Sequence, residues 1–301
     1  ASDIKKSVAN NLRPDLGFRS VYDKRASNLA NIVTDNHLNF LSPLTEEKLF
    51  EWHRQLVAHR SDLKQIGAYR TSTQNMQIVS GPIGREKVHY IAPPAKRVAQ
   101  EMKLYLQWFN QSKREMGASI DAPIRAGIAH LYFELIHPFE DGNGRIGRVI
   151  AEKALAQNLT YPLPFSISHI ISANTSEYYT ALQSANTTLT IDSWIHYFVQ
   201  VCLEAVEHGL AVYKFTLRKV RYFQLLDKKL NPAQTKAIHR MWAAGPSGFQ
   251  GGMTAKKYCR INRVSPATAT RDLAYLTKMG ALERHGGGRS THYLLPVDRK
   301  G

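Results

Sequence analysis

The segment His-Pro-Phe-Glu-Asp-Gly-Asn-Gly-Arg-Ile-Gly-Arg, residues 137–148, lies between two stretches that each have the pattern of an α-helix. The run IRAGIAHLYFELI, residues 124–136, precedes it, and the run VIAEKALAQN, residues 149–158, follows it. Glycines, acids, an asparagine and arginines are unusual where two apolar helices meet, because such residues mostly face solvent or a ligand. We therefore expect a loop and the first turn of a helix that together carry a functional site.

A helix that starts near Asn143 or Gly144 makes the end of this segment a site for anions. The first amides of a helix have no intrahelical partner and carry partial positive charge. Gly142 and Gly144 leave room for a ligand, and the side-chain amide of Asn143 can donate to a phosphate oxygen. Arg145 and Arg148 are three residues apart, so both lie on one face and match more than one phosphate.

Two other side chains of the segment are suited to hold a metal and to accept a proton. Asp141 is a hard oxygen ligand for Mg²⁺, which binds through few carboxylates together with substrate phosphates. His137 is suited to take a proton near neutral pH. The combination fits the attack of a hydroxyl on a nucleotide phosphate. A plain glycine turn and a histidine that only caps a helix are the simpler alternatives, but neither accounts for the whole block. The chain has no GxxxxGK(S/T) and no GxGxxG after a strand.

The segment resembles the motif HxFx(D/E)GNGRxxR of the Fic-domain family at every defined position. The resemblance spans residues 40–210 and includes GAYR at 67–70 and SEYYTALQSAN at 176–186. It implies a mainly α-helical core with a β-hairpin flap. It also implies an enzyme, a nucleotidyltransferase, that moves AMP from ATP with Mg²⁺ to a protein hydroxyl.

The resemblance also implies roles for single residues. His137 would deprotonate a Ser, Thr or Tyr hydroxyl, Phe139 would fix the loop by packing into the core, and Asp141 would hold Mg²⁺. The implied nucleotide-binding residues are Gly142, Asn143, Gly144, Arg145, Arg148, Ile78, Val79, Ser80, Gly81, Tyr178, Tyr179 and Asn186. Residues 75–94 are expected to form a hairpin that docks the target protein by strand addition. From the residues alone, Asn186 also fits a helix cap, and one of the adjacent tyrosines fits the core.

Members of this family often carry a restraining helix with the pattern (S/T)xxxE(G/N), whose glutamate pairs with the second arginine of the motif. Residues 42–46 have this spacing, but Glu47 follows in place of Gly or Asn. Thr45, Glu46 and Glu47 fit the start of a helix better. We therefore expect the restraining segment to lie upstream of this sequence, and the site as given to be the released form.

The net charge of +16 is concentrated near the C-terminus of the 301-residue chain. Residues 213–301 hold 18 Lys and Arg against 4 Asp and Glu, whereas residues 1–212 hold 22 against 20. Two cysteines without a CxxC exclude a disulfide scaffold and favour a cytoplasmic protein, and no apolar run is long enough for a membrane. The predicted parts are an N-terminal helical segment 1–40, a catalytic domain 41–212, a helical linker 213–235 and a C-terminal domain 236–301.

The C-terminal part has the order of a winged helix-turn-helix domain. Residues 253–262 and 265–279 predict two helices, and residues 282–295 predict two short strands around a glycine turn. The charge predicts an anionic partner, which leaves DNA, RNA and an acidic protein open. The expected DNA contacts are Lys256, Lys257, Arg263, Thr268, Thr270, Arg271 and Arg289. The alternative functions are a DNA-binding regulator with a nucleotide-sensing site and an enzyme that transfers another phosphate-containing group; a homodimer is left open.

Overall fold

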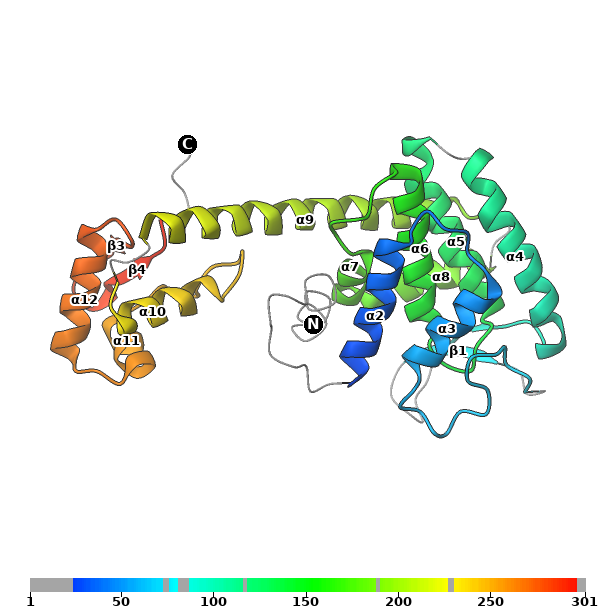
Figure 1. Ribbon diagram of the computed structural model, residues 1–301, viewed down its shortest axis with the longest axis horizontal. Coiled ribbons are helices and arrows are strands. Elements are labelled where there is room, and N and C mark those ends of the chain that lie inside the picture. Colours follow the sequence, from blue (N-terminus) through cyan, green and yellow to red (C-terminus); the bar gives the residue numbers. More distant parts are fainter. Residues whose placement is uncertain are drawn as a thin grey trace. The chain divides into compact units, whose positions relative to one another are not determined.

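The computed structural model describes residues 24–72, 76–80, 87–115, 118–187, 190–226 and 230–296 (Figure 1). Within these ranges helices dominate and the strands form two short pairs, which confirms the predicted mainly helical class. The chain divides into two compact units, one that ends at Val206 and one that begins at Glu207. No helix in the described ranges is both long enough and apolar enough to cross a membrane.

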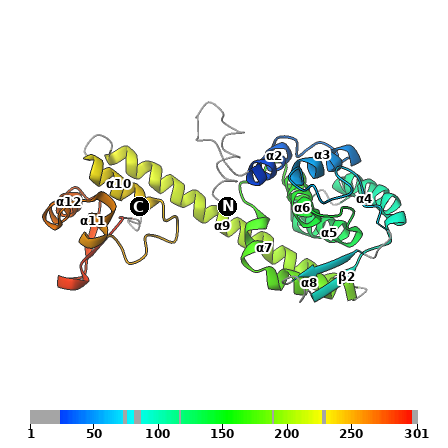
Figure 2. The same ribbon diagram turned by 90° about the horizontal axis from the view of Figure 1, so that it is seen from below.

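The first unit is a bundle of helices built around α5 and α6. Its helices are α2 (Lys24–Leu38), α3 (Glu46–Leu56), α4 (Ala95–Glu115), α5 (Ala122–Ile136), α6 (Asn143–Leu159), α7 (Ile167–Ala173) and α8 (Thr175–Thr187), with a 3-10 turn η2 (Ser119–Asp121) before α5. α5 and α6 run side by side, and α3 and α4 also contact α6 (Figure 2). The short connection from α5 to α6 therefore lies against the core of this unit.

A buried arginine fixes the packing of α4, α5 and α6. Most of α5 is buried, and Arg125 in its first half is fully buried. The Arg125 guanidinium donates to Ser112 Oγ (2.9 Å) and Phe109 O (2.8 Å) on α4, and to Gln157 Oε1 (2.9 Å) on α6. A buried charge is tolerated only when its donors are satisfied, so these bonds hold the three helices in one register.

Helix starts and ends follow the sequence in most places. Thr45 caps α3 as predicted, because its side chain accepts from Lys48 N. α7 was not predicted, since it is a short helix that follows a proline-rich stretch at residues 161–165. α9 (Asp192–Leu226) runs past residue 212, the predicted end of the catalytic domain, because Phe215 and Tyr222 pack their rings into the core of the second unit. Within the linker 213–235, which was predicted to be helical, α9 extends to Leu226 and the next helix begins at Pro232.

The strands β1 (Gln77–Ser80) and β2 (Lys87–Ile91) pair in an antiparallel manner, with a bulge after Ile78. β2 lies beside α8, which Figure 2 shows at the edge of the first unit. The structure describes Ile78, Val79 and Ser80 by their backbone in β1. Gly81, together with the turn expected to join the strands, lies outside the described residues.

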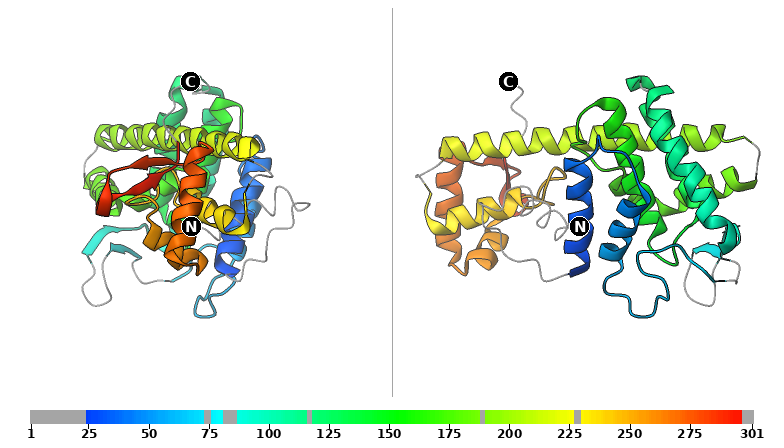
Figure 3. Two further views of the ribbon diagram at one scale, coloured as in Figure 1. Left: turned by 90° about the vertical axis from the view of Figure 1, so that its left-hand side faces the viewer. Right: turned by 45° about the vertical axis from the view of Figure 1, so that its right-hand side comes forward.

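The second unit contains α10 (Pro232–Trp242), α11 (Ala255–Asn262), α12 (Pro266–Lys278), β3 (Glu283–His285), the 3-10 turn η3 (Gly288–Ser290) and β4 (His292–Leu294) (Figure 3). β3 and β4 pair in an antiparallel manner. Asp272 on α12 is buried and accepts from Tyr258 Oη (2.9 Å) on α11 and from Gln234 Nε2 (3.3 Å) on α10. These bonds tie the three helices together around a small core.

Candidate active site

A cleft of about 340 Å³ lies over the connection from α5 to α6. Its size falls within the range of small-molecule sites, roughly 300–1,000 Å³. It is formed by the 137–148 segment together with parts of α5, α8 and the residue before β1. The lining residues are Met76, Glu134, His137, Glu140, Asp141, Gly142, Asn143, Gly144, Arg145, Arg148, Tyr178, Tyr179 and Leu182.

His137 ends α5 in the left-handed backbone conformation, with φ 49° and ψ 61°. This conformation is strained for a residue with a side chain, so the surroundings must hold it. Arg70, which is 2% exposed, does so: its Nε donates to His137 O (2.7 Å) and its guanidinium also reaches Ile136 O (3.3 Å) and Pro93 O (2.6 Å). The backbone N–H of Arg70 donates to Pro138 O (2.9 Å). The GAYR stretch therefore clamps the turn that presents His137.

The imidazole of His137 is neutral at neutral pH. Burial, the largest cause, acts together with the charge of Arg70 to lower the pKa of His137 to about 4, while a hydrogen bond with the Glu134 backbone and the carboxylate of Asp141 act in the opposite direction. Its Nδ1 lies 3.9 Å from Glu134 Oε2, on the preceding turn of α5. Burial raises the pKa of Glu134 to about 7, against the lowering effect of Arg148. A neutral imidazole has a lone pair free to accept a proton.

Asn143 and His53 give the loop its shape. Asn143 is 2% exposed, and its side chain accepts from Phe139 N (2.9 Å) and donates to Phe139 O (2.8 Å). Phe139 is fully buried and stacks on the His53 ring at 4.1 Å. His53 Nδ1 accepts from Gly67 N (2.9 Å), so the proton sits on Nε2, which donates to Asp141 O (3.2 Å). The Asn143 side chain thus closes the loop on itself, and its contact with phosphate stays a prediction.

Two glycines of the motif allow neighbouring helices to approach its backbone closely. Gly142 has φ +89°, and a Cβ atom there would lie 2.8 Å from Leu56 Cδ2 on α3. A Cβ atom at Gly147 would lie 2.7 Å from Glu134 Oε1 on α5. The start of α6 therefore fits between α3 and α5 only without side chains at these two positions.

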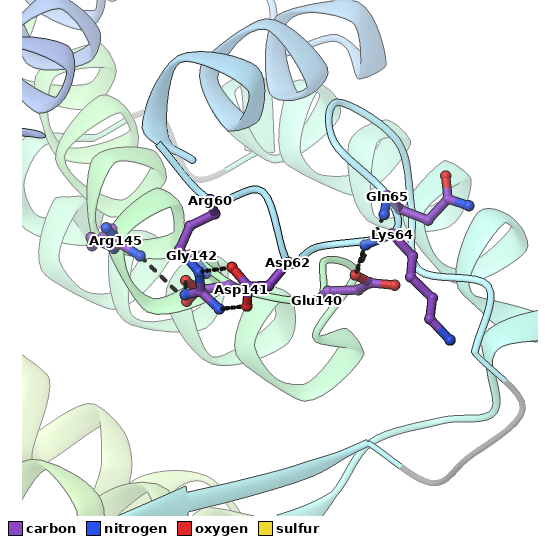
Figure 4. A network of polar contacts seen from close by, with 8 residues as sticks. All are labelled: Arg60, Asp62, Lys64, Gln65, Glu140, Asp141, Gly142 and Arg145. Carbon is purple, nitrogen blue, oxygen red and sulfur yellow. Dashed lines mark hydrogen bonds and ion pairs between the residues drawn. The ribbon is translucent and has the colours of Figure 1, made fainter. Parts of the chain in front are cut away.

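Asp141 is held by two arginines and one backbone amide (Figure 4). Its Oδ2 accepts from Arg60 at 2.5 Å, while its Oδ1 accepts from Gly142 N at 2.6 Å and from Arg145 at 3.3 Å. Arg60 also pairs with Asp62 at 2.6 Å, on the loop after α3. The next carboxylate, Glu140, accepts from backbone amides of the same loop at residues 64 and 65. The loop after α3 is therefore tied to both acids of the motif.

The cleft contains a carboxylate, the type of oxygen ligand that Mg²⁺ prefers. No group of three His, Cys, Asp or Glu that could hold a metal occurs among the described residues, so the predicted ligand Asp141 would act as a single carboxylate. Mg²⁺ commonly binds through one or two carboxylates and takes its other ligands from water and substrate phosphates. Arg60 occupies Oδ2 of Asp141, so a cation at this oxygen has to displace that guanidinium.

The structure brings both predicted tyrosines to the cleft but not Asn186. Tyr178 is 4% exposed and its hydroxyl lies 3.0 Å from His130 Nε2, while Tyr179 packs against it with ring centroids 5.2 Å apart. Burial lowers the pKa of His130 to about 3, so this histidine is neutral and structural. Asn186, two turns further along α8, is absent from the cleft lining among the described residues.

Several residues at the site have no role predicted from the sequence: Met76, Glu134, Glu140 and Leu182 line the cleft, and Arg60 and Arg70 bond to residues of the motif. Glu134 precedes His137 by three residues on a helix, and that spacing was a readable signal because such residues share a face. Arg70 belongs to the GAYR stretch, but its buried role depends on contacts distant in sequence. Arg60 and Met76 reach the site from outside the motif, and no local pattern indicates this.

The residues expected to contact DNA lie on α11, α12 and η3 of the second unit, apart from Arg263, which directly follows α11. Lys256, Arg263, Thr270, Arg271 and Arg289 are exposed, and Lys257 and Thr268 are half-buried. The Lys257 ammonium donates to Gln250 O (2.7 Å) and Gly252 O (2.9 Å), so it holds the loop before α11.

Residues 43–155 match the family model described as the Fic/DOC family. This match contains the complete 137–148 motif, α3 to α5 and most of α6. It confirms the resemblance to the Fic-domain family for this segment. A solved structure of a Fic domain containing signaling protein from Bacteroides thetaiotaomicron has a similar fold, with a TM-score of 0.52 and 21% identity. That comparison covers 69% of this chain and 78% of the solved one.

Curated relatives include enzymes of one named class. A probable protein adenylyltransferase of Aquifex aeolicus is 31% identical over 93 residues, which is 31% of this chain and 25% of the relative. The protein adenylyltransferase fic-1 of Caenorhabditis elegans is 23% identical over 202 residues, which is 67% of this chain and 35% of the relative. The chain thus spans between a quarter and about a third of the length of these relatives.

Proposed function

We propose that this chain is a protein adenylyltransferase that transfers AMP from ATP to a Ser, Thr or Tyr hydroxyl of a target protein. The observation that carries the proposal is a buried, neutral His137 beside the first turn of α6, with Arg145 and Arg148 on the same cleft. The named relatives support this class of enzyme. The cleft thus combines a proton acceptor with positive charge for an oligophosphate.

The proposed step is a displacement at the α-phosphate of ATP. The target oxygen forms a bond to the α-phosphorus, the bond from that phosphorus to the bridging oxygen breaks, and pyrophosphate leaves. The hydroxyl proton passes to the His137 imidazole. Catalysis of this kind depends mainly on positioning and on charge stabilisation.

In this proposal, the residues around His137 bind the phosphates, hold the metal and keep His137 in position. The amides at the start of α6 and the guanidiniums of Arg145 and Arg148 bind the phosphates and offset the charge that develops on pyrophosphate. Arg70 keeps the backbone of His137 in place. Asp141 would hold Mg²⁺, which neutralises phosphate charge when bound. β1 offers a strand edge on which an extended target segment could align its hydroxyl with the cleft.

The proposal predicts which phosphate of ATP stays on the product. With ATP radiolabelled at the α-phosphate, the chain is expected to label itself or a protein of a cell lysate. With ATP labelled at the γ-phosphate, no protein is expected to be labelled, since the γ-phosphate leaves in pyrophosphate. Label from the γ-position on protein would instead indicate phosphate transfer, the alternative within the same family.

Arg60→Ala is expected to lower the Mg²⁺ concentration that gives half-maximal AMP transfer. The Arg60 guanidinium pairs with Oδ2 of Asp141, and both side chains are about a third exposed. Exposed ion pairs contribute roughly 0.2–1 kcal/mol, so the expected shift is up to about fivefold. The measurement is initial rate against Mg²⁺ concentration. Arg97→Ala removes an equally short pair with Glu101 on α4 and should leave the curve unchanged. A higher Mg²⁺ requirement in Arg60→Ala would contradict the view that Arg60 competes with Mg²⁺ for Asp141.

DNA binding by a winged helix-turn-helix domain is the second candidate function, supported by the exposed Lys and Arg side chains of α11, α12 and η3. α11, α12 and the β3–β4 pair follow one another in the order that this kind of domain has. Fluorescence anisotropy with duplex DNA tests it: affinity should fall steeply as salt rises, and Arg271→Ala should weaken it. An affinity that does not change with salt concentration would indicate a partner other than DNA.

A further inference from the structure

α9 carries a stripe of apolar side chains that is open to solvent. The stripe, called the α9 seam below, has alternating spacings of four and three residues. Each member keeps between 37% and 60% of its side chain exposed. Its members are Val199, Leu203, Val206, Leu210, Tyr213, Leu217 and Val220.

The α9 seam is separate from the two faces that α9 uses for packing. Trp194, Phe198 and Ala205 bury their side chains in the core of the first unit. Phe215 and Tyr222 pack against the core of the second unit, with the Phe215 ring 5.1 Å from that of Trp242. Successive residues of a helix are about 100° apart, so Phe198 and Ala205 point away from the seam residues next to them. Phe215 and Tyr222 come two positions after the seam residues Tyr213 and Val220, so they project about 200° around the helix from them. The seam is thus an additional face.

The spacing indicates that another helix covers this face. A strict seven-residue repeat drifts by about 20° per heptad on a straight helix, and it stays on one line only when two helices supercoil. The seam keeps this repeat over three heptads, about 33 Å of helix. Sustained apolar positions of this kind are the signature of a coiled coil.

The charges beside the seam select a second copy of α9 in the opposite direction. The residues that follow Val199, Val206, Tyr213 and Val220 are Gln200, Glu207, Lys214 and Arg221, and all lie on one flank. The other flank carries only Cys202, Gly209 and Thr216. A parallel pair sets unlike flanks together, so these charges would meet no partner. An antiparallel pair sets like flanks together.

From this arrangement we infer that the chain forms a homodimer through an antiparallel coiled coil of two α9 helices. With Leu210 of one copy beside Tyr213 of the other, Glu207 of each copy lies across from Lys214 of the other. Gln200 of each copy then lies across from Arg221 of the other. The two-fold symmetry repeats each pair, as in other isologous dimers. The dimer does not depend on the proposed AMP transfer.

The first test measures the association of the full chain by sedimentation over a range of concentrations. The wild-type chain is expected to sediment with twice the mass of one chain. Leu210→Glu puts two buried charges into the seam and should weaken the dimer by roughly 100-fold or more. The control is Leu104→Glu on α4, where the leucine is 49% exposed against 48% for Leu210. A wild-type chain that stays monomeric, as it would if another segment covered the seam, overturns the inference.

The second test settles the direction of the helices and uses exposed positions only. At low salt, Glu207→Lys alone and Lys214→Glu alone should each weaken the dimer by about tenfold, because two attractive pairs become repulsive. The double variant E207K/K214E restores both pairs and should recover the wild-type affinity. Circular dichroism confirms that each variant is folded. Single variants without effect, or a double variant without recovery, would overturn the antiparallel pairing.

Discussion

His137→Ala is expected to reduce the initial rate of AMP transfer by about 100- to 10,000-fold, the usual contribution of a general base. The structure gives the reason: the imidazole is buried, neutral at neutral pH and placed on the cleft beside the first turn of α6. An alanine removes the imidazole to which the proposal assigns the proton of the target hydroxyl. The rate is measured from the incorporation of α-labelled ATP.

Two controls separate the loss of the base from the loss of the site. ATP binding to His137→Ala, measured by titration calorimetry, should stay within a few-fold of wild type, since Arg145 and Arg148 are untouched. His196→Ala changes an exposed histidine on α9 and should keep the wild-type rate. If His137→Ala transferred AMP at the wild-type rate, His137 would not be the base.

Arg70→Met is expected to lower both the stability of the chain and the rate of AMP transfer. Arg70 is 2% exposed and donates side-chain hydrogen bonds to three backbone carbonyls, two of them at the end of α5. Hydrogen bonds to charged groups contribute roughly 1.5–3 kcal/mol each, so the loss of three should lower the free energy of unfolding by about 4.5 kcal/mol or more. Methionine fills similar space but leaves those carbonyls unpaired.

The fall in rate should exceed what the unfolded fraction explains. The backbone of His137 keeps its left-handed conformation through these bonds, so folded Arg70→Met should present the imidazole poorly. Urea denaturation gives the stability, and rates are compared where each variant is fully folded. Arg97→Met, at an exposed arginine, should change the stability by less than about 1 kcal/mol. A folded Arg70→Met with the wild-type rate would show that the clamp is not needed.

The helical class could be predicted from the sequence because long amphipathic or apolar runs determine local structure. The sequence also predicted that residues of the 137–148 segment share one cleft, since its glycines and charged residues lie within one loop and the helical turns that follow it. The features that could not be predicted from the sequence depend on tertiary packing. The continuation of α9 past residue 212 depends on Phe215 and Tyr222 finding a second core.

Contacts between distant residues explain the parts of the site that the sequence could not show. Arg60 reaches Asp141 across 81 positions, and Arg70 reaches His137 across 67. Neither distance leaves a periodic signal. Asn143 illustrates a different limit, because its type suggested a phosphate ligand while its amide is bonded to Phe139.

The most direct test of the central claim is the mass of the modified protein. The chain is incubated with ATP and Mg²⁺, alone and with lysate proteins, and the products are analysed by mass spectrometry with fragmentation. The account predicts an addition of one AMP on a Ser, Thr or Tyr side chain, absent when His137→Ala replaces the wild-type chain. No adduct on any protein, or an adduct that persists with His137→Ala, would contradict it.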